Sequence, residues 1–184
     1  MVAPDPSPTG GKPARIELRL RELKQLFDSF DPAPFHEQDL DGDAEEYIVS
    51  WAREYPVDAA LVFRLHLPQD QKALDPERTV QQAFQRYFLY RAELAQLEVK
   101  RTLQQGRASL GVGVLFLALC MLARELAGGL PFDGAHVVQE GLLIVGWVAM
   151  WRPIELLLYD WWPLRRRRRT YENLARMRVE VVYQ

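Results

Sequence analysis

Three side chains with ion-pairing or acid–base chemistry lie inside an apolar stretch near the end of the chain, GWVAMWRPIELLLYDWWP. In a helix, Arg152 and Glu155 lie three residues apart on one face, and Tyr159 lies one turn beyond Glu155 on the same side. A charge within a bilayer costs at least about 2.5 kcal/mol and therefore usually has a partner or faces a polar interior. This face is a candidate site for an ion, a proton or a lipid headgroup. The alternative is an ion pair within one helix, with Arg152 extended towards lipid phosphates and no role beyond anchoring.

Two apolar runs in the last third of the chain predict a hairpin of membrane helices over residues 108–163. The first run has about 15 apolar residues, fewer than the roughly 20 that cross a bilayer, so we expect this helix to continue through Arg124 and Glu125 and to cover 108–130. Glycines and a proline then predict a turn, and the second helix covers 137–162.

Two alternatives to this hairpin stay open. The apolar runs are also compatible with buried helices of a soluble protein. In the second alternative the membrane part ends near Trp151, and the residues that follow form a separate interfacial helix bent at Pro153.

Charge predicts the orientation of the hairpin. Lys100, Arg101 and Arg107 precede the first helix and five arginines follow the second, whereas the connecting turn has a single arginine against several carboxylates. Both termini should therefore face the cytoplasm. We expect Pro163 to end the second helix at the cytoplasmic membrane surface. An aromatic belt lies at this surface, and the arginine run that follows is expected to bind anionic lipid headgroups. The predicted anchoring residues are Trp161, Trp162, Arg165, Arg166, Arg167, Arg168 and Arg169.

Composition alone would suggest a soluble protein. The 184 residues include 26% charged residues, and the mean hydropathy is -0.21, because a charged front half offsets an apolar back half. The single cysteine, Cys120, lies in an apolar run and is expected to be a buried small residue rather than part of a disulfide. Residues 1–14 have several prolines and no apolar core, so we expect a disordered tail and no export signal.

Residues 15–75 predict a small cytoplasmic αβ module. Alternating apolar residues from Arg15 indicate a strand that passes into a short helix, although one helix over this segment fits nearly as well. A loop follows, and then a helix from about Asp43 that should place Trp51 in a core. Leu61 to Leu67 alternate as a second strand, which can pair in parallel with the first through a right-handed crossover. Two strands need a covering helix or a neighbouring subunit to be stable.

A long amphipathic helix over residues 76–107 is predicted to cover that sheet and then to continue as a stalk. Asp75 and Pro76 are typical of a helix start, and an apolar stripe begins at Val80. In the first membrane helix, Gly111 and Gly113 are expected to let the second helix approach closely.

Other motifs fail on spacing. Asp39, Asp41 and Asp43 alternate as in a calcium loop, but the glycine and glutamate that such a loop needs are missing. The three histidines are scattered, and there is no phosphate loop, dinucleotide fingerprint or nucleophile elbow. We therefore expect no metal, no cofactor, no nucleic-acid partner and no enzymatic activity.

Three segments together resemble a known family. They are DPAPFHEQDLDGDAEEYIVSWARE (31–54), GRASLGVGVLFLA (106–118) and GWVAMWRPIELLLYDWWP (146–163), of which the last is the most distinctive. The chain is similar in these segments, and over most of its length after the first fourteen residues, to small bacterial inner-membrane proteins with two membrane helices and no assigned activity. The resemblance implies a bacterial inner-membrane location and carries over no catalytic or binding residues.

The prediction is thus an α+β membrane protein in which a basic cytoplasmic tail, residues 164–184, follows the hairpin. Two function classes fit. The first is a scaffold that presents its module to a protein partner or to a second copy of the chain. The second is a subunit of an oligomeric transporter or channel in which Arg152, Glu155 and Tyr159 line a polar path.

Overall fold

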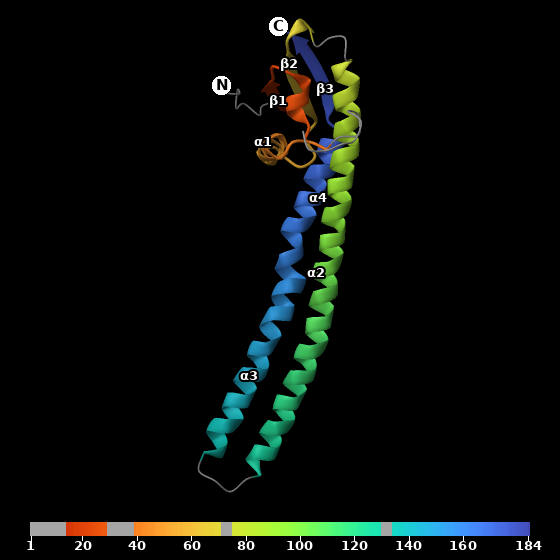
Figure 1. The fold of residues 1–184 in the computed structure, drawn as a ribbon. Helices are drawn as coiled ribbons and strands as arrows, with labels where there is room; N and C mark the ends of the chain where they lie inside the picture. The colour runs from red at the N-terminus through yellow and green to blue at the C-terminus, as the bar shows by residue number, and fades with distance from the viewer. Residues whose placement is uncertain (1–13, 29–38, 71–74, 130–133) are drawn as a thin grey trace. The chain divides into compact units, whose positions relative to one another are not determined.

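The computed structural model describes residues 14–28, 39–70, 75–129 and 134–184, which form two compact units. The αβ unit comprises Met1–Leu94 and Arg166–Gln184, and the helical unit comprises Ala95–Arg165. Figure 1 shows the order of the elements. The predicted disordered tail up to residue 13, most of the predicted loop before α1, and the middle of the predicted turn at 130–133 lie outside the described residues.

The sheet of the αβ unit has three parallel strands in the order β1 (Ala14–Arg19), β2 (Leu61–Leu67) and β3 (Arg178–Tyr183). The two predicted strands and their parallel pairing are confirmed, with Ile16 opposite Phe63. The prediction of only two strands is wrong, because β3 lies in the segment that was expected to be a basic tail. The alternating valines of RVEVVY are typical of a strand, but the preceding arginine run dominated the interpretation.

Two short elements connect β1 to β2. The strand passes into the 3-10 helix η1 (Leu23–Leu26), as predicted, and α1 (Gly42–Arg53) follows. The carboxylate of Asp41 accepts hydrogen bonds from the N–H groups of Asp43 and Ala44, which satisfies donors at the helix start. Trp51 was expected in the core but is only half-buried. The buried face of α1 instead consists of Ile48, Val49 and Ala52.

The first turns of α2 (Pro76–Gly128) cover one face of the sheet. The helix begins at the predicted Pro76. The rings of Phe63 on β2 and Phe84 on α2 lie 4.9 Å apart, and Phe84 contacts Phe88 edge-on at 5.6 Å. Tyr171, near the end of α4 (Trp161–Ala175), stacks on Phe88 at 6.2 Å. A residue from the last part of the chain thus helps to close a core built on β2 and α2.

The helical unit contains the rest of α2, α3 (Ala135–Glu155), the π-helical turn η3 (Leu156–Asp160) and the start of α4. The prediction that Pro163 ends the helix is wrong, since α4 continues to Ala175. A proline lacks the N–H that would bond four residues back. The carbonyl four residues before Pro163 belongs to Tyr159 in the π-helical turn η3. The hydrogen-bond register of the helix already changes there, so the missing bond disturbs the helix least.

Glycines let α2 and α3 pack closely within the helical unit. A Cβ at Gly113 would lie 3.1 Å from the sulfur of Met150 and 3.3 Å from Pro153, as expected for a small residue against large ones. The same prediction is wrong for Gly111, which has nothing within 4 Å. A Cβ at Gly146 would lie 2.8 Å from a methyl carbon of Leu117, so this glycine is a further contact point that the sequence did not reveal.

The fold class is α+β, with two helical stretches long and apolar enough to cross a membrane, Pro76–Gly128 and Ala135–Ala175. Only 17% of the residues in the apolar window of each stretch are buried. Core helices of soluble proteins bury most of such a window, so the outward apolar surface favours a bilayer environment over a soluble core.

Candidate functional site

The predicted polar face on α3 is an ion-pair cluster of Arg152, Glu155 and Asp160. One guanidinium nitrogen of Arg152 lies 3.0 Å from a carboxylate oxygen of Glu155 and 3.5 Å from a carboxylate oxygen of Asp160. The three side chains are 64%, 44% and 36% exposed, respectively. The cluster thus combines one positive and two negative charges on the outer surface of the helical unit.

The π-helical turn explains why Asp160 contacts Arg152. In a regular helix, residues eight apart differ by about 80° around the axis. A π-helical turn holds about one residue more per turn and rotates the following residues back by roughly 100°, which moves Asp160 onto the face of Arg152. Tyr159, which a regular helix would place there, is 68% exposed, and Asp160 takes the contact with Arg152. Sequence reasoning missed Asp160 because it assumed one helical period throughout.

The arginine run differs in its surroundings from residue to residue. The guanidinium of Arg165 lies 5.7 Å from the centre of the Trp161 ring. Arg167 donates to the hydroxyl of Tyr171 at 3.3 Å, and Arg168 donates to Glu172 at 2.8 Å. Trp162 is 69% exposed. Arg165, Arg166 and Arg169 are exposed, whereas Arg167 and Arg168 are half-buried.

A buried carboxylate joins three helices of the αβ unit and was not anticipated. Glu45 on α1, with a side chain only 14% exposed, lies 2.7 Å from a guanidinium nitrogen of Arg91 on α2. It also accepts hydrogen bonds from the hydroxyls of Tyr87 at 2.7 Å and Tyr171 at 3.3 Å. Burial and the bond to Glu45 raise the pKa of Tyr87 above its usual value, so this hydroxyl stays protonated and keeps donating. The arrangement satisfies a buried charge and fixes the helices against one another.

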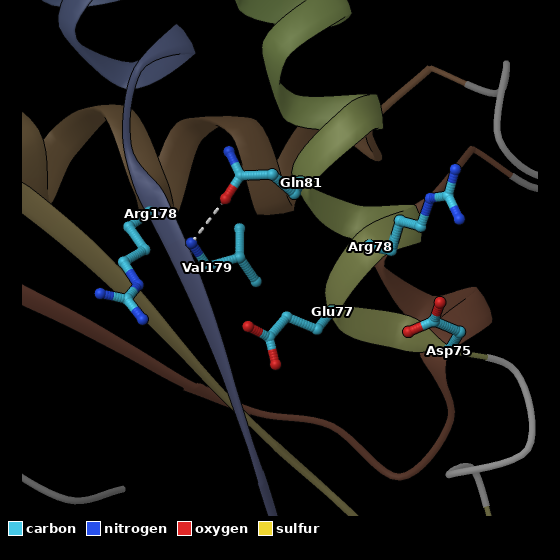
Figure 2. Close-up of a pocket in the computed structure, with 6 residues that line it drawn as sticks. All are labelled: Asp75, Glu77, Arg78, Gln81, Arg178 and Val179. Atoms are coloured by element: carbon cyan, nitrogen blue, oxygen red, sulfur yellow. Dashed lines mark hydrogen bonds between the residues drawn. The ribbon is translucent and has the colours of Figure 1, made fainter.

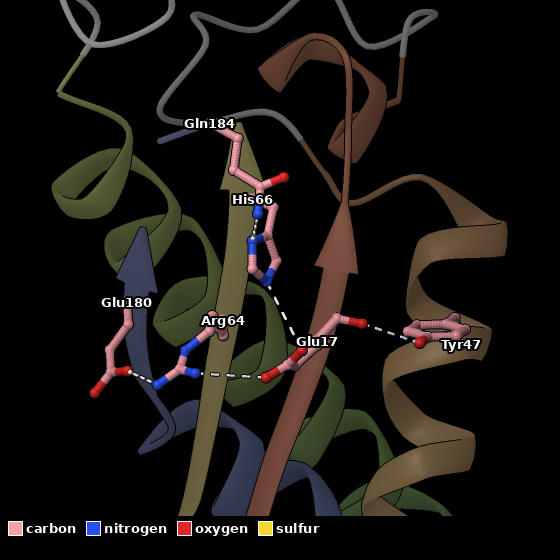
Figure 3. Close-up of polar contacts among 6 residues, drawn as sticks. All are labelled: Glu17, Tyr47, Arg64, His66, Glu180 and Gln184. Atoms are coloured by element: carbon pink, nitrogen blue, oxygen red, sulfur yellow. Dashed lines mark hydrogen bonds and ion pairs between the residues drawn. The ribbon is translucent and has the colours of Figure 1, made fainter. Parts of the chain in front are cut away.

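The sheet face opposite α2 is polar. Figure 3 shows Arg64 at its centre, 3.5 Å from Glu17 on β1 and 3.1 Å from Glu180 on β3. His66 lies beside this row, with its Nδ1 3.0 Å from the amide nitrogen of Gln184. By the two-residue period of the strands, three exposed arginines flank the same face: Arg15, Arg19 and Arg178. Because Arg64 engages both glutamates, the flanking arginines give the open sheet face an excess of positive charge.

A shallow depression of about 340 Å³ lies at the outer edge of β3. As Figure 2 shows, Gln81 of α2 accepts from the N–H of Val179 at 2.9 Å. The amide nitrogen of Gln81 donates to the carbonyl of Met177, also at 2.9 Å. The side chain of Gln81 pairs with this part of the strand edge as a neighbouring strand would. The depression is thus a structural contact with mixed charges around it rather than a convergent binding site.

Comparison of the chain with protein-family models, curated proteins and solved structures finds no match. The resemblance to small bacterial inner-membrane proteins therefore stays a prediction.

Proposed function

We propose that this chain is a non-enzymatic membrane-anchored scaffold, with its hairpin in a bacterial inner membrane and both termini in the cytoplasm. The observation that carries the proposal is the apolar outer surface of the helical unit. Val112, Leu119 and Val148 are 69%, 56% and 67% exposed, and a bilayer would cover such side chains. The exposed arginines of α4 beside Trp161 and Trp162 would then bind anionic headgroups, at about 1 kcal/mol for each.

The open sheet face is the surface that the scaffold would present. All-parallel sheets are almost always covered on both faces. Among the described residues, α2 covers one face here and no helix packs across the other. The other face holds four arginines against two glutamates, counting Arg64 with the three flanking arginines. An acidic surface of a cytoplasmic protein is the complementary partner of this face.

Replacing Arg15, Arg19 and Arg178 together by glutamate tests the scaffold role. We expect partner proteins cross-linked to the full-length chain in native membranes to be lost, because the face becomes acidic. The matched control replaces Arg53, Arg78 and Arg86, exposed arginines on the helices α1 and α2 rather than on the strands, and should keep the same partners. If both variants cross-linked the same partners equally well, the open sheet face would not be the partner-binding surface.

The second candidate, a subunit of an oligomeric transporter or channel, is favoured only by the charged cluster in the apolar helices. A conducting assembly would lose ion flux in proteoliposomes when Arg152 and Glu155 are both replaced by leucine. A scaffold would keep its membrane location and its partners after the same change.

A further inference from the structure

Within the helical unit, the backbone of Arg152 lies deeper than Arg107, the charge that precedes the apolar run of α2. A Cβ at Gly106 would touch Leu157, so Arg107 lies at about the level of this part of η3. Gly113, about two helical turns further along α2, packs against Met150 and Pro153 of α3. Arg152 is four residues before Leu156, which places its backbone about 6 Å further into the apolar region than Arg107.

The cluster is open to its surroundings at this depth. Charged residues in membrane helices almost always face the interior of a bundle or a water-filled cavity. Here Arg152 is 64% exposed, and Val148, one turn earlier, is 67% exposed, so this face of α3 points away from α2. A single hairpin would therefore leave this polar face uncovered at the edge of its apolar surface.

The cluster also presents both signs of charge on one face, so a second copy of the chain can form ion pairs with it. One guanidinium is in contact with two carboxylates, and the guanidinium lies at the level of the carboxylates rather than of its own backbone. Across a two-fold axis along the membrane normal, each Arg152 would meet Glu155 of the other copy at the same depth. Each guanidinium would then contact a carboxylate of the other copy as well as its own, which is the reciprocal contact that a two-fold axis requires.

We propose that two copies of this chain associate in the membrane through the face of α3 that carries Arg152, Glu155 and Asp160, with ion pairs exchanged between the copies. The proposal rests on the proposed membrane anchoring. It differs from the transporter hypothesis, because paired ions that close an interface need not conduct. It also assigns self-association to the hairpin and leaves the open sheet face for a different partner.

Charge exchange tests this interface. In a Cys120→Ala background, a Val148→Cys chain expressed at native level should form a disulfide-linked dimer in membrane vesicles when a copper–phenanthroline oxidant is added. Like charges placed in contact repel each other, so Arg152→Glu alone should lower the dimer fraction roughly tenfold or more. The double variant Glu155→Arg with Asp160→Arg should do the same. Co-expression of the two variants with different tags should restore the dimer as a mixed species.

Leu115→Cys, an exposed position on α2 away from this face, is the control and should give little dimer. Cross-linking that both charge variants leave unchanged, or mixed expression without recovery, would overturn the interface. The fraction that sediments with membranes is measured for every variant. A chain that sediments fully but never cross-links contradicts only the dimer, whereas a chain that stays in the supernatant contradicts the membrane anchoring itself.

Discussion

Ending the chain after Arg176 is expected to unfold the αβ unit. The truncation removes β3, which pairs with β2 along its length, and the side chains of Met177 and Val179, each 1% exposed. Burial of two such side chains contributes about 3–6 kcal/mol, a large part of the roughly 5–15 kcal/mol by which a domain is stable. Loss of the β2–β3 hydrogen bonds adds to this.

Limited proteolysis of the full chain in detergent measures the effect. We expect cleavage within residues 61–67 in the truncated chain and protection in the intact one. The matched control replaces Arg178 and Glu180 by threonine, which keeps the strand and its buried side chains and should stay protected. Unchanged protection after truncation would mean that residues 177–184 are a dispensable tail.

Replacing Gly146 by leucine is expected to separate α2 and α3 within the helical unit. A Cβ at this position would lie 2.8 Å from Leu117 and 3.2 Å from the Cβ of Cys120, and the backbone of Leu117 is only 3.6 Å away. Overpacking of this kind costs about 1–3 kcal/mol, and here it acts where small residues allow the helices to approach. The two helices have to move apart.

Cys120, which is 6% exposed and the only cysteine, reports this separation without further engineering. We expect a membrane-permeant maleimide to label Cys120 roughly tenfold faster in Gly146→Leu. A tenfold change corresponds to about 1.4 kcal/mol less free energy favouring the packed over the separated helices. Gly141→Leu is the control, because Gly141 has nothing within 4 Å and the added side chain meets open space. Equal labelling of the wild type and both variants would contradict the glycine contact.

Local periodicity predicted those parts of the fold that depend on neighbouring residues. The alternation in Leu61–Leu67, the start of α2 at Pro76 and the contact of Gly113 with α3 all follow from side-chain spacing or size. The missed features depend on long-range or irregular geometry. Glu45 meets Arg91 only when α1 packs on α2, and β3 is recognisable mainly by its pairing with β2.

The polar cluster shows the same limit within a single helix. Arg152 and Glu155 were predicted to share a face, and their nitrogen and oxygen atoms lie 3.0 Å apart. Asp160 joins them only because η3 changes the helical period, and single-turn irregularities of this kind have no reliable sequence signal.

The most direct test of the central claim is the sidedness of the hairpin in intact cells. In a Cys120→Ala background, His136→Cys lies at the end of the predicted turn and Ser50→Cys lies on α1. We expect a membrane-impermeant maleimide to label His136→Cys in intact cells and to label Ser50→Cys only after the cells are permeabilised. Labelling of both positions only after permeabilisation, or recovery of the protein in the detergent-free supernatant, would contradict a hairpin that crosses the bilayer.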